Sequence, residues 1–183
     1  MNVLDAIKDR TSYRGSYKNT AVPRENLVKI LEAGLAAPSG CNAQTTSLIA
    51  VDDAALMHKL HEFIPTESTK IAPVMIFVLT QKICTYGNTC YNIQDYSAAI
   101  QNMLLAILDL GYQTCWYEGI VTGVPPSGDK TDTLGRKLAN ILGVPEDYEL
   151  VCYLPVGIAD QDVTPRNKKS FEERAWFNGF KTI

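Results

Sequence analysis

Two arginines flank a pair of hydroxyl residues near the start of the chain, in the segment Asp9-Arg10-Thr11-Ser12-Tyr13-Arg14. The formal net charge of the protein is -3, so this cluster does not belong to a generally basic surface. A guanidinium group meets phosphate oxygens with two parallel N–H donors, and a Thr or Ser hydroxyl adds a short neutral donor. The cluster therefore predicts a local anion-binding site. The alternative is that both arginines only complement the dipole at the end of a helix.

A second polar segment, Pro38-Ser39-Gly40-Cys41-Asn42-Ala43-Gln44, follows a predicted helix. The side-chain amides of Asn42 and Gln44 each present a hydrogen-bond donor and an acceptor. Such amides suit a ligand whose rim alternates carbonyl and N–H groups, as the pyrimidine end of a flavin does. Taken alone, the segment is better explained as the turn residues that stop a helix.

Two more polar segments follow predicted strands. They are Trp116-Tyr117-Glu118-Gly119 and, after Leu154-Pro155-Val156-Gly157, the basic run Arg166-Asn167-Lys168-Lys169. A charge run is usually only a solvated surface. The chain has no Gly-x-Gly-x-x-Gly, P-loop or Gly-x-Ser-x-Gly motif, and no ligands accompany His58 and His61, its only histidines. We therefore expect both histidines at the surface, and neither a metal site nor a His-based triad.

The length of the chain indicates one compact domain that spans residues 1–183. Hydrophobic residues make up 46% of the chain and charged residues 20%, as in ordinary globular proteins. An isoelectric point near 5.4 argues against nucleic-acid binding. The first residues lack a secretory signal, and polar residues interrupt the apolar segment Ile93–Leu110, so we expect a cytoplasmic protein without a membrane span. The five cysteines show no paired spacing, and we expect them reduced and mostly structural.

Hydrophobic periodicity places helices and strands in mixed order without strict alternation, which favours α+β over a doubly wound sheet. We expect a helix over Asn2–Asp9, with Val3 and Ile7 on one face, and a second helix after Pro23, with Leu27, Ile30, Leu31 and Leu35 at helical spacing. Asp53 should cap a third helix, with Leu56, Leu60 and Phe63 on its core face. The last two expected helices are Asn92–Leu110 and Lys130–Leu142. The expected strands are Ser47–Val51, Ala72–Thr80, Gln113–Tyr117 and Tyr148–Ile158, the second of them buried on both faces.

The helix Asn92–Leu110 is apolar nearly all round, which places it in the middle of the domain or in a subunit interface. The tail, about residues 170–183, contains Trp176, Phe177 and Phe180. These aromatics should pack on something, and a partner subunit is a candidate.

The order and spacing of the polar segments resemble the nitroreductase family of flavin enzymes over nearly the whole chain. Arg10, Ser12 and Arg14 match the family's Arg-x-Ser-x-Arg/Lys motif, and Pro38–Gln44 matches Pro-Ser-Ser-x-Asn-x-Gln. The Glu118-Gly119 pair, the strand end Leu154–Gly157 and the late basic residues follow in the family's order.

The resemblance implies a homodimer with a central, mostly antiparallel sheet flanked by helices, and with the long helix at the dimer interface. Each of two FMN sites would be made by both subunits. It implies that Arg10, Thr11 and Ser12 hold the phosphate together with Arg166 or Lys168, and that Arg14 lies near flavin N1 and the C2 carbonyl. Pro38, Ser39, Asn42 and Gln44 would come from the other subunit, and the backbone of Glu118 and Gly119 would meet flavin N5.

The implied activity is ping-pong electron transfer from NAD(P)H through flavin N5 to a nitroaromatic, a quinone or a similar conjugated acceptor. Gly40 and Thr45-Thr46 depart from the family pattern, and the short segments Phe63–Ile71 and Thr80–Asn92 leave the acceptor open. Tyr86, Tyr91 and Tyr117 are aromatic candidates beside the flavin, or core residues. The alternatives are a flavin storage or sensing protein of the same fold with little turnover, and an interaction domain without flavin.

Overall fold

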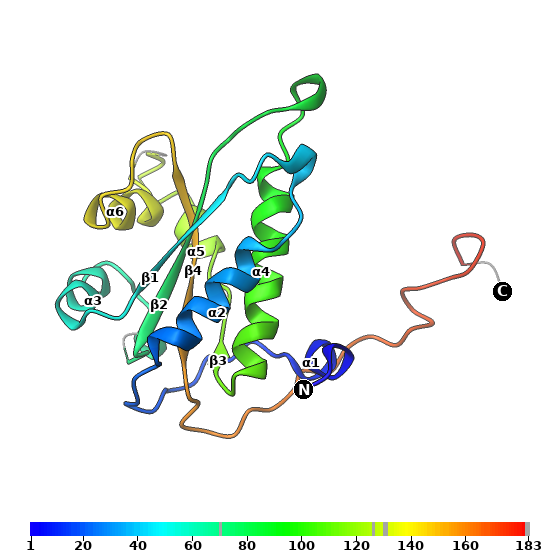
Figure 1. Ribbon diagram of the computed structural model, residues 1–183, viewed down its shortest axis with the longest axis horizontal. Coiled ribbons are helices and arrows are strands. Elements are labelled where there is room, and N and C mark those ends of the chain that lie inside the picture. The colour runs from blue at the N-terminus through cyan, green and yellow to red at the C-terminus, as the bar shows by residue number, and fades with distance from the viewer. Residues whose placement is uncertain (70, 126, 130–131, 182–183) are drawn as a thin grey trace.

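A four-stranded antiparallel sheet forms the centre of the described part of the molecule (Figure 1). The computed structural model describes residues 1–183 except Lys70, Pro126, Lys130, Thr131, Thr182 and Ile183. The strands are β1 (Thr46–Val51), β2 (Val74–Thr80), β3 (Gln113–Thr114) and β4 (Glu149–Gly157). They lie in the order β1-β2-β4-β3, and each neighbouring pair is antiparallel. The expected α+β class with a mainly antiparallel sheet is confirmed.

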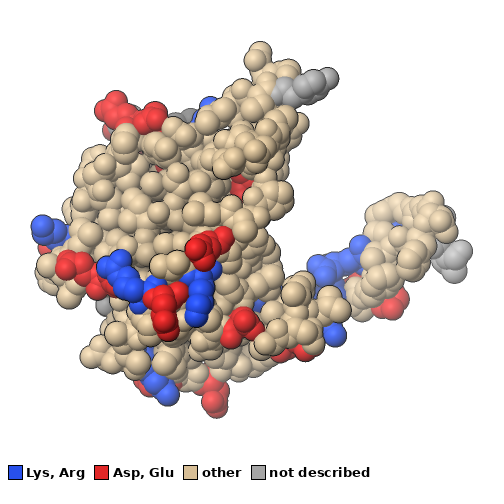
Figure 2. Space-filling model, viewed as in Figure 1, with Lys and Arg blue, Asp and Glu red and all other residues tan. Residues whose placement is uncertain are grey.

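Helices α2 (Arg24–Leu35) and α4 (Asn92–Asp109) cover one face of this sheet. Charged side chains are sparse over the upper parts of these helices in Figure 2. Val28, Leu35 and Ile93 are among the exposed apolar residues here, at 49%, 61% and 60% exposure. One side of α4 therefore lies in the domain core, while apolar side chains of both helices remain uncovered by this copy of the chain.

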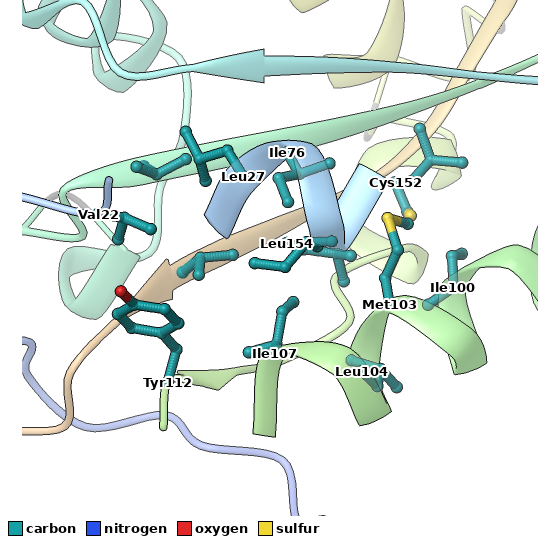
Figure 3. Packing of buried hydrophobic residues seen from close by; sticks show 14 of the residues in the cluster. Val22, Leu27, Ile76, Ile100, Met103, Leu104, Ile107, Tyr112, Cys152 and Leu154 are labelled. Carbon is teal, nitrogen blue, oxygen red and sulfur yellow. The ribbon is translucent and has the colours of Figure 1, made fainter. Parts of the chain in front are cut away.

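The inward sides of α2 and α4 meet alternate residues of the strands (Figure 3). Ile76 and Leu154 point to this side because successive strand residues face opposite sides of the sheet. They pack with Ile100, Met103 and Leu27 in one fully buried cluster. The same alternation sends Phe77 and Tyr153 to the other face.

The second face carries α3 (Ala54–His61), α5 (Gly119–Thr122) and α6 (Leu134–Ile141), whose buried side chains include Leu60 and Leu138. The expected cap of α3 is confirmed, since the Asp53 carboxylate accepts the Leu56 N–H at 2.8 Å. The expected burial of β2 on both faces is also confirmed. The remaining short elements are the N-terminal helix α1 (Val3–Asp9) and the 3-10 turns η1 (Gly40–Asn42), η2 (Glu67–Thr69) and η3 (Tyr86–Asn88).

Several element limits differ from those expected. The predicted strand Gln113–Tyr117 shrinks to β3 and one isolated pairing between Tyr117 and Tyr153. The predicted helix Lys130–Leu142 begins at Leu134, where the Thr133 hydroxyl accepts the Arg136 N–H. Its predicted start at Lys130 lies outside the described residues. Helix α5 was not predicted, because four residues are too short to show a hydrophobic period.

Besides Leu35, the apolar positions Phe63, Val3 and Ile7, which periodicity assigned to helix faces, are solvent-exposed. Phe63 is 44% exposed because α3 ends at His61, so its expected place on the core face is wrong. Val3 and Ile7 do share one side of α1, but they are 68% and 50% exposed. Periodicity identifies an apolar face, whereas the tertiary fold decides whether this copy of the chain covers it.

The tail beyond β4 leaves the domain without forming a helix or strand in its described part (Figure 1). Phe177 and Phe180 are 77% and 76% exposed. Trp176 packs edge-on against Phe180, with ring centroids 4.6 Å apart. The tail aromatics therefore contact one another and not the core of their own domain. No helix in the described residues is long and apolar enough to cross a membrane.

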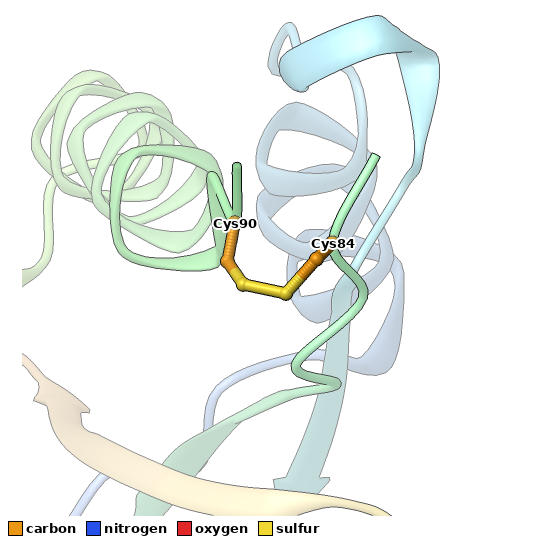
Figure 4. Close-up of a disulfide and its surroundings, with 2 residues drawn as sticks. All are labelled: Cys84 and Cys90. Carbon is orange, nitrogen blue, oxygen red and sulfur yellow. A yellow bond between two sulfur atoms is a disulfide. The ribbon is translucent and has the colours of Figure 1, made fainter. Parts of the chain in front are cut away.

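Cys84 and Cys90 form a disulfide, so the expectation that all cysteines are reduced is wrong (Figure 4). The intervening turn passes through Gly87 and Asn88, both with positive φ, and brings the two Cα atoms within 4.1 Å. Spacing along the chain does not reveal this pairing, because the turn decides it. Cys115 and Cys152 are free and buried, as expected for structural thiols, whereas Cys41 is free and exposed.

Candidate functional site

The arginine cluster leaves α1 and runs beside the exit of β4. The Tyr13 N–H donates to the Thr114 carbonyl at 2.9 Å, and Tyr17 pairs with Ala159. Backbone hydrogen bonds between residues 16–18 and 158–160 continue this pairing. The N-terminal segment is therefore held against the beginning of the C-terminal tail, far from it in sequence.

A cavity of about 770 Å³ lies between these two segments. Arg14 and Arg166 both line it, and so do Thr11 and Ser12. The remaining lining residues are Tyr13, Gly15, Gln161, Asp162, Val163, Thr164, Pro165 and Asn167. The structure thus brings together four of the residues predicted to bind the cofactor, whereas Arg10 and Lys168 do not line this cavity. Two guanidinium groups and two hydroxyls that line one cavity are a donor set for an anion.

The buried Cys115 thiol lies close to the residues of the arginine cluster. Burial raises the pKa of Cys115, while the positive charge of Arg14 and a hydrogen bond from Ser12 act in the opposite direction. The charge of Arg10 also lowers the pKa of this thiol, so Arg10 lies within electrostatic reach of the same point.

The helix dipole accounts for only part of the arginine cluster. Arg10 is the C-terminal cap of α1, and its backbone N–H donates to the Ala6 carbonyl at 3.0 Å. Arg14 lies four positions beyond the cap, outside the last turn where the dipole acts. The position of Arg14 therefore needs another explanation, and its place in the cavity wall supplies one.

The segment Pro38–Gln44 is a constrained loop at the other end of α2. Cys41, Asn42 and Gln44 all adopt positive φ, at 53°, 55° and 48°. Such left-handed conformations cost free energy for residues other than glycine and persist only where surrounding contacts impose them. The Ser39 hydroxyl supplies one such contact by accepting the Gln44 N–H at 3.0 Å.

Asp95 of α4 supplies two more contacts to this loop. One carboxylate oxygen accepts the Gly40 N–H and the other accepts the Thr45 hydroxyl, each at 2.8 Å. Asp95 is 4% exposed, so both of these hydrogen bonds are shielded from water. In the sequence, Asp95 is one of the polar residues that interrupt the apolar segment Ile93–Leu110. A carboxylate within such a helix was the signal for a buried polar anchor.

A small cavity of about 180 Å³ lies against the constrained loop. Pro38, Ser39 and Gln44 line it, whereas Asn42 is exposed and does not. The cavity shares no described lining residue with the cavity of Arg14 and Arg166. Within one copy of the chain, the two groups of predicted site residues are therefore separate.

The Glu118-Gly119 pair forms the start of α5. Glu118 is the residue before the helix, and its carbonyl accepts the Val121 N–H at 2.7 Å. Its carboxylate accepts the hydroxyl of Tyr96 at 2.8 Å, which ties α5 to α4. Burial raises the pKa of Tyr96, and the hydrogen bond to Glu118 adds to the effect. Neither Glu118 nor Gly119 lines the two cavities described above.

The aromatic candidates have different surroundings. The Tyr91 ring packs against Gly40, where an added Cβ would lie 2.4 Å from the ring, so this tyrosine requires glycine at position 40. Tyr117 stacks on the fully buried Tyr153, with ring centroids 5.1 Å apart. The side chain of Tyr86 lies outside the described part of the structure. The expected surface position of His58 is confirmed, whereas His61 is only partly exposed and its Nε2 atom is buried. The described residues contain no group suited to hold a metal ion.

Comparisons with known proteins connect this arrangement to one family. A sequence model of the Nitroreductase family matches residues 7–71 and 65–158. A Methanothermobacter thermautotrophicus protein, provisionally named NADH dehydrogenase/NAD(P)H nitroreductase, is 33% identical over 162 residues, which cover 86% of this chain and 77% of that protein. An Archaeoglobus fulgidus protein with the same name is 29% identical, with 93% of this chain and 89% of that protein covered.

A solved structure shows the same fold. The structure of an FMN-dependent nitroreductase from Clostridium difficile R20291 superimposes with a TM-score of 0.79 at 27% identity, and the match covers 97% of this chain and 100% of that one. The predicted resemblance is thus confirmed by sequence and by structure. This chain belongs to the nitroreductase family.

Proposed function

We propose that this protein is an FMN-dependent oxidoreductase that transfers electrons from NAD(P)H to a nitroaromatic, a quinone or a similar conjugated acceptor. The observation that carries the proposal is the cavity that Arg14 and Arg166 line together with Thr11 and Ser12. The names of the family relatives support the same chemistry.

The donor set of the larger cavity fits the phosphate of FMN. A phosphate monoester carries about -1.5 to -2 charges at pH 7 and accepts several hydrogen bonds. Arg14 and Arg166 in the wall, with Arg10 close by, outnumber the one carboxylate there, Asp162. We assign Arg10, Thr11 and Ser12 to the phosphate with Arg166, and we keep Lys168 as the second candidate for the late cation.

The ring of the flavin would lie between two copies of the chain. Pro38, Ser39, Asn42 and Gln44 are separate from the phosphate-binding residues within one copy, which supports a site to which a second copy contributes them. The exposed apolar residues of α1, α2 and α4 offer a surface for that second copy. Burying such residues in a homodimer removes apolar area from water.

FMN, when bound, supplies a two-electron carrier, and the residues around it set its position and field. We place Arg14 beside N1 and the C2 carbonyl of the ring, where a fixed positive charge stabilises negative charge. The backbone N–H groups of Glu118 and Gly119 would face N5 of the bound ring. NAD(P)H and the acceptor would use the same face of the ring in turn, which predicts ping-pong kinetics. We propose a cytoplasmic location for this reaction.

The first test is an absorption spectrum of the purified protein with and without added FMN. The proposal predicts a yellow protein with bound flavin, and a protein that takes up no FMN would contradict it. Arg10→Ala should weaken FMN binding about tenfold or more, whereas Lys8→Ala, an exposed lysine of α1, should not. Equal effects of the two changes would contradict the phosphate assignment.

The second test is steady-state NAD(P)H oxidation with menadione or a nitrofuran as acceptor. Sustained turnover with parallel double-reciprocal plots supports the ping-pong oxidoreductase. FMN binding without turnover would instead indicate a flavin storage or sensing protein.

A further inference from the structure

The disulfide Cys84–Cys90 closes a short ring immediately before α4 (Figure 4). The two cysteines are six positions apart, and the entropic stabilisation by a disulfide increases with the length of the loop that it closes. A ring this small therefore constrains the unfolded chain less than a longer loop would. Its effect is local, on the turn through Gly87 and Asn88, which both adopt positive φ.

The segment closed by this disulfide is coupled, through Tyr91 and Asp95, to the constrained loop Pro38–Gln44. Tyr91 follows Cys90 directly, and its ring lies so close to Gly40 that no Cβ fits between them. One turn later in α4, Asp95 accepts the Gly40 N–H and the Thr45 hydroxyl. The same end of α4 thus holds both the disulfide and the anchors of the loop, so the path of residues 84–91 determines how Tyr91 meets Gly40.

The two sulfur atoms are inequivalent. Cys84 is exposed, whereas Cys90 is half-buried and lies just ahead of the N-terminal end of the 18-residue helix α4. A helix N-terminus stabilises a nearby thiolate and makes it a better leaving group. An incoming thiolate therefore has access to Cys84 Sγ, and Cys90 is the preferred leaving group.

We infer that Cys84–Cys90 is a reversible thiol–disulfide centre that controls the order of the loop Pro38–Gln44, and through it flavin affinity, a consequence that rests on the proposed function. A dithiol reductant attacks Cys84 Sγ, which forms a mixed disulfide and releases the Cys90 thiolate, which then takes a proton. The second thiol of the reductant attacks the mixed disulfide and releases Cys84. Two electrons pass to the protein, and the reductant leaves as a disulfide. Disulfides of cytoplasmic proteins are usually redox-active in this way.

The first part of the test establishes the two redox states. Alkylation with iodoacetamide in denaturant should label three cysteines in the protein as purified, since three are free, and two more after treatment with dithiothreitol. Labelling of all five without reductant, in protein purified and denatured under air, would contradict the disulfide and with it the inference.

The second part measures the loop itself, by hydrogen exchange of the peptide 37–46 in both states. Reduction should speed exchange of the Gly40 amide by about tenfold or more, because the hydrogen bond to Asp95 then opens more often. A Cys84→Ser, Cys90→Ser double variant should match the reduced protein and ignore dithiothreitol. If that variant does not fold, the comparison of the two states of the unmodified protein still decides. Equal exchange in both states would overturn the inference.

Cys41→Ser is the matched control, because Cys41 is exposed, free and next to Gly40. It should retain the full response to dithiothreitol, and loss of the response would assign the redox change to Cys41 instead. FMN titration of both states separates the two proposals. Altered exchange with no FMN binding in either state would refute the proposed function alone. FMN binding of equal strength in both states would refute the link from disulfide to flavin alone.

Discussion

Asp95 holds the backbone of Gly40 across 55 positions of sequence, with its carboxylate 2.8 Å from the Gly40 N–H. The second carboxylate oxygen accepts the Thr45 hydroxyl at the same distance. Between these two anchors lie the left-handed residues Cys41, Asn42 and Gln44. A buried carboxylate with two donors thus fixes a backbone conformation that the residues would not adopt alone.

Asp95→Asn should lower the free energy of unfolding by about 1–3 kcal/mol, because one amide oxygen replaces two charged acceptors. Urea unfolding measures this loss. Asp109→Asn, at the exposed opposite end of α4, removes only a surface ion pair to the N-terminus and should cost less than about 1 kcal/mol. Similar losses in both variants would show that the Asp95 hydrogen bonds stabilise the fold no more than a surface ion pair does.

Arg166→Ala should weaken FMN binding more than Lys168→Ala does, by about tenfold. Arg166 lines the cavity together with Arg14 and Ser12, whereas Lys168 does not. Titration of FMN fluorescence with each variant measures the difference. A larger effect of Lys168→Ala would make Lys168 the cation that meets the phosphate.

Ile93→Asp should convert the proposed dimer into monomers, because it places a charge among the exposed apolar residues of α2 and α4. Sedimentation velocity at several protein concentrations measures the association. Phe63→Asp changes an exposed apolar residue that follows α3, on the other face of the sheet, and should leave the dimer intact. Dimers of Ile93→Asp as stable as the unmodified ones would exclude this face from the interface.

Alkaline pH should destabilise the fold through its buried tyrosines. Burial raises the pKa of Tyr153 from 10 to about 12. The folded state therefore keeps the phenol proton that the unfolded chain loses, so this stabilisation is complete below pH 10 and declines as the pH rises towards 12. Tyr153 contributes a slope of up to about 1.4 kcal/mol per pH unit in that range.

Tyr153→Phe should make the free energy of unfolding fall less steeply between pH 10 and 12. Buried Tyr17 and Tyr96, whose pKa values burial also raises, remain and keep part of the slope. Urea unfolding at closely spaced pH values measures both slopes. Identical slopes for the variant and the unmodified protein would show that Tyr153 ionises in the folded state as readily as in the unfolded chain.

The amino-acid sequence by itself determined which segments form helices or strands, and it determined the family to which the chain belongs. The continuous apolar run of β2 and the Asp53 cap of α3 are local signals, so they were readable without a structure. The motif containing Arg14 and the later Arg166 were likewise visible in the expected order. Local periodicity reports which residues prefer a common face or turn, and this is why these predictions held.

The tertiary structure alone decided which distant groups meet. Arg14 and Arg166 line one cavity only because the chain after β4 pairs with residues 16–18. Cys84 and Cys90 pair because Gly87 and Asn88 turn the chain back through positive φ. Asp95 accepts the Gly40 N–H because α4 packs beside α2. Such contacts depend on the path of the whole backbone and on which apolar faces are covered. Neither quantity is encoded in the spacing of a single motif.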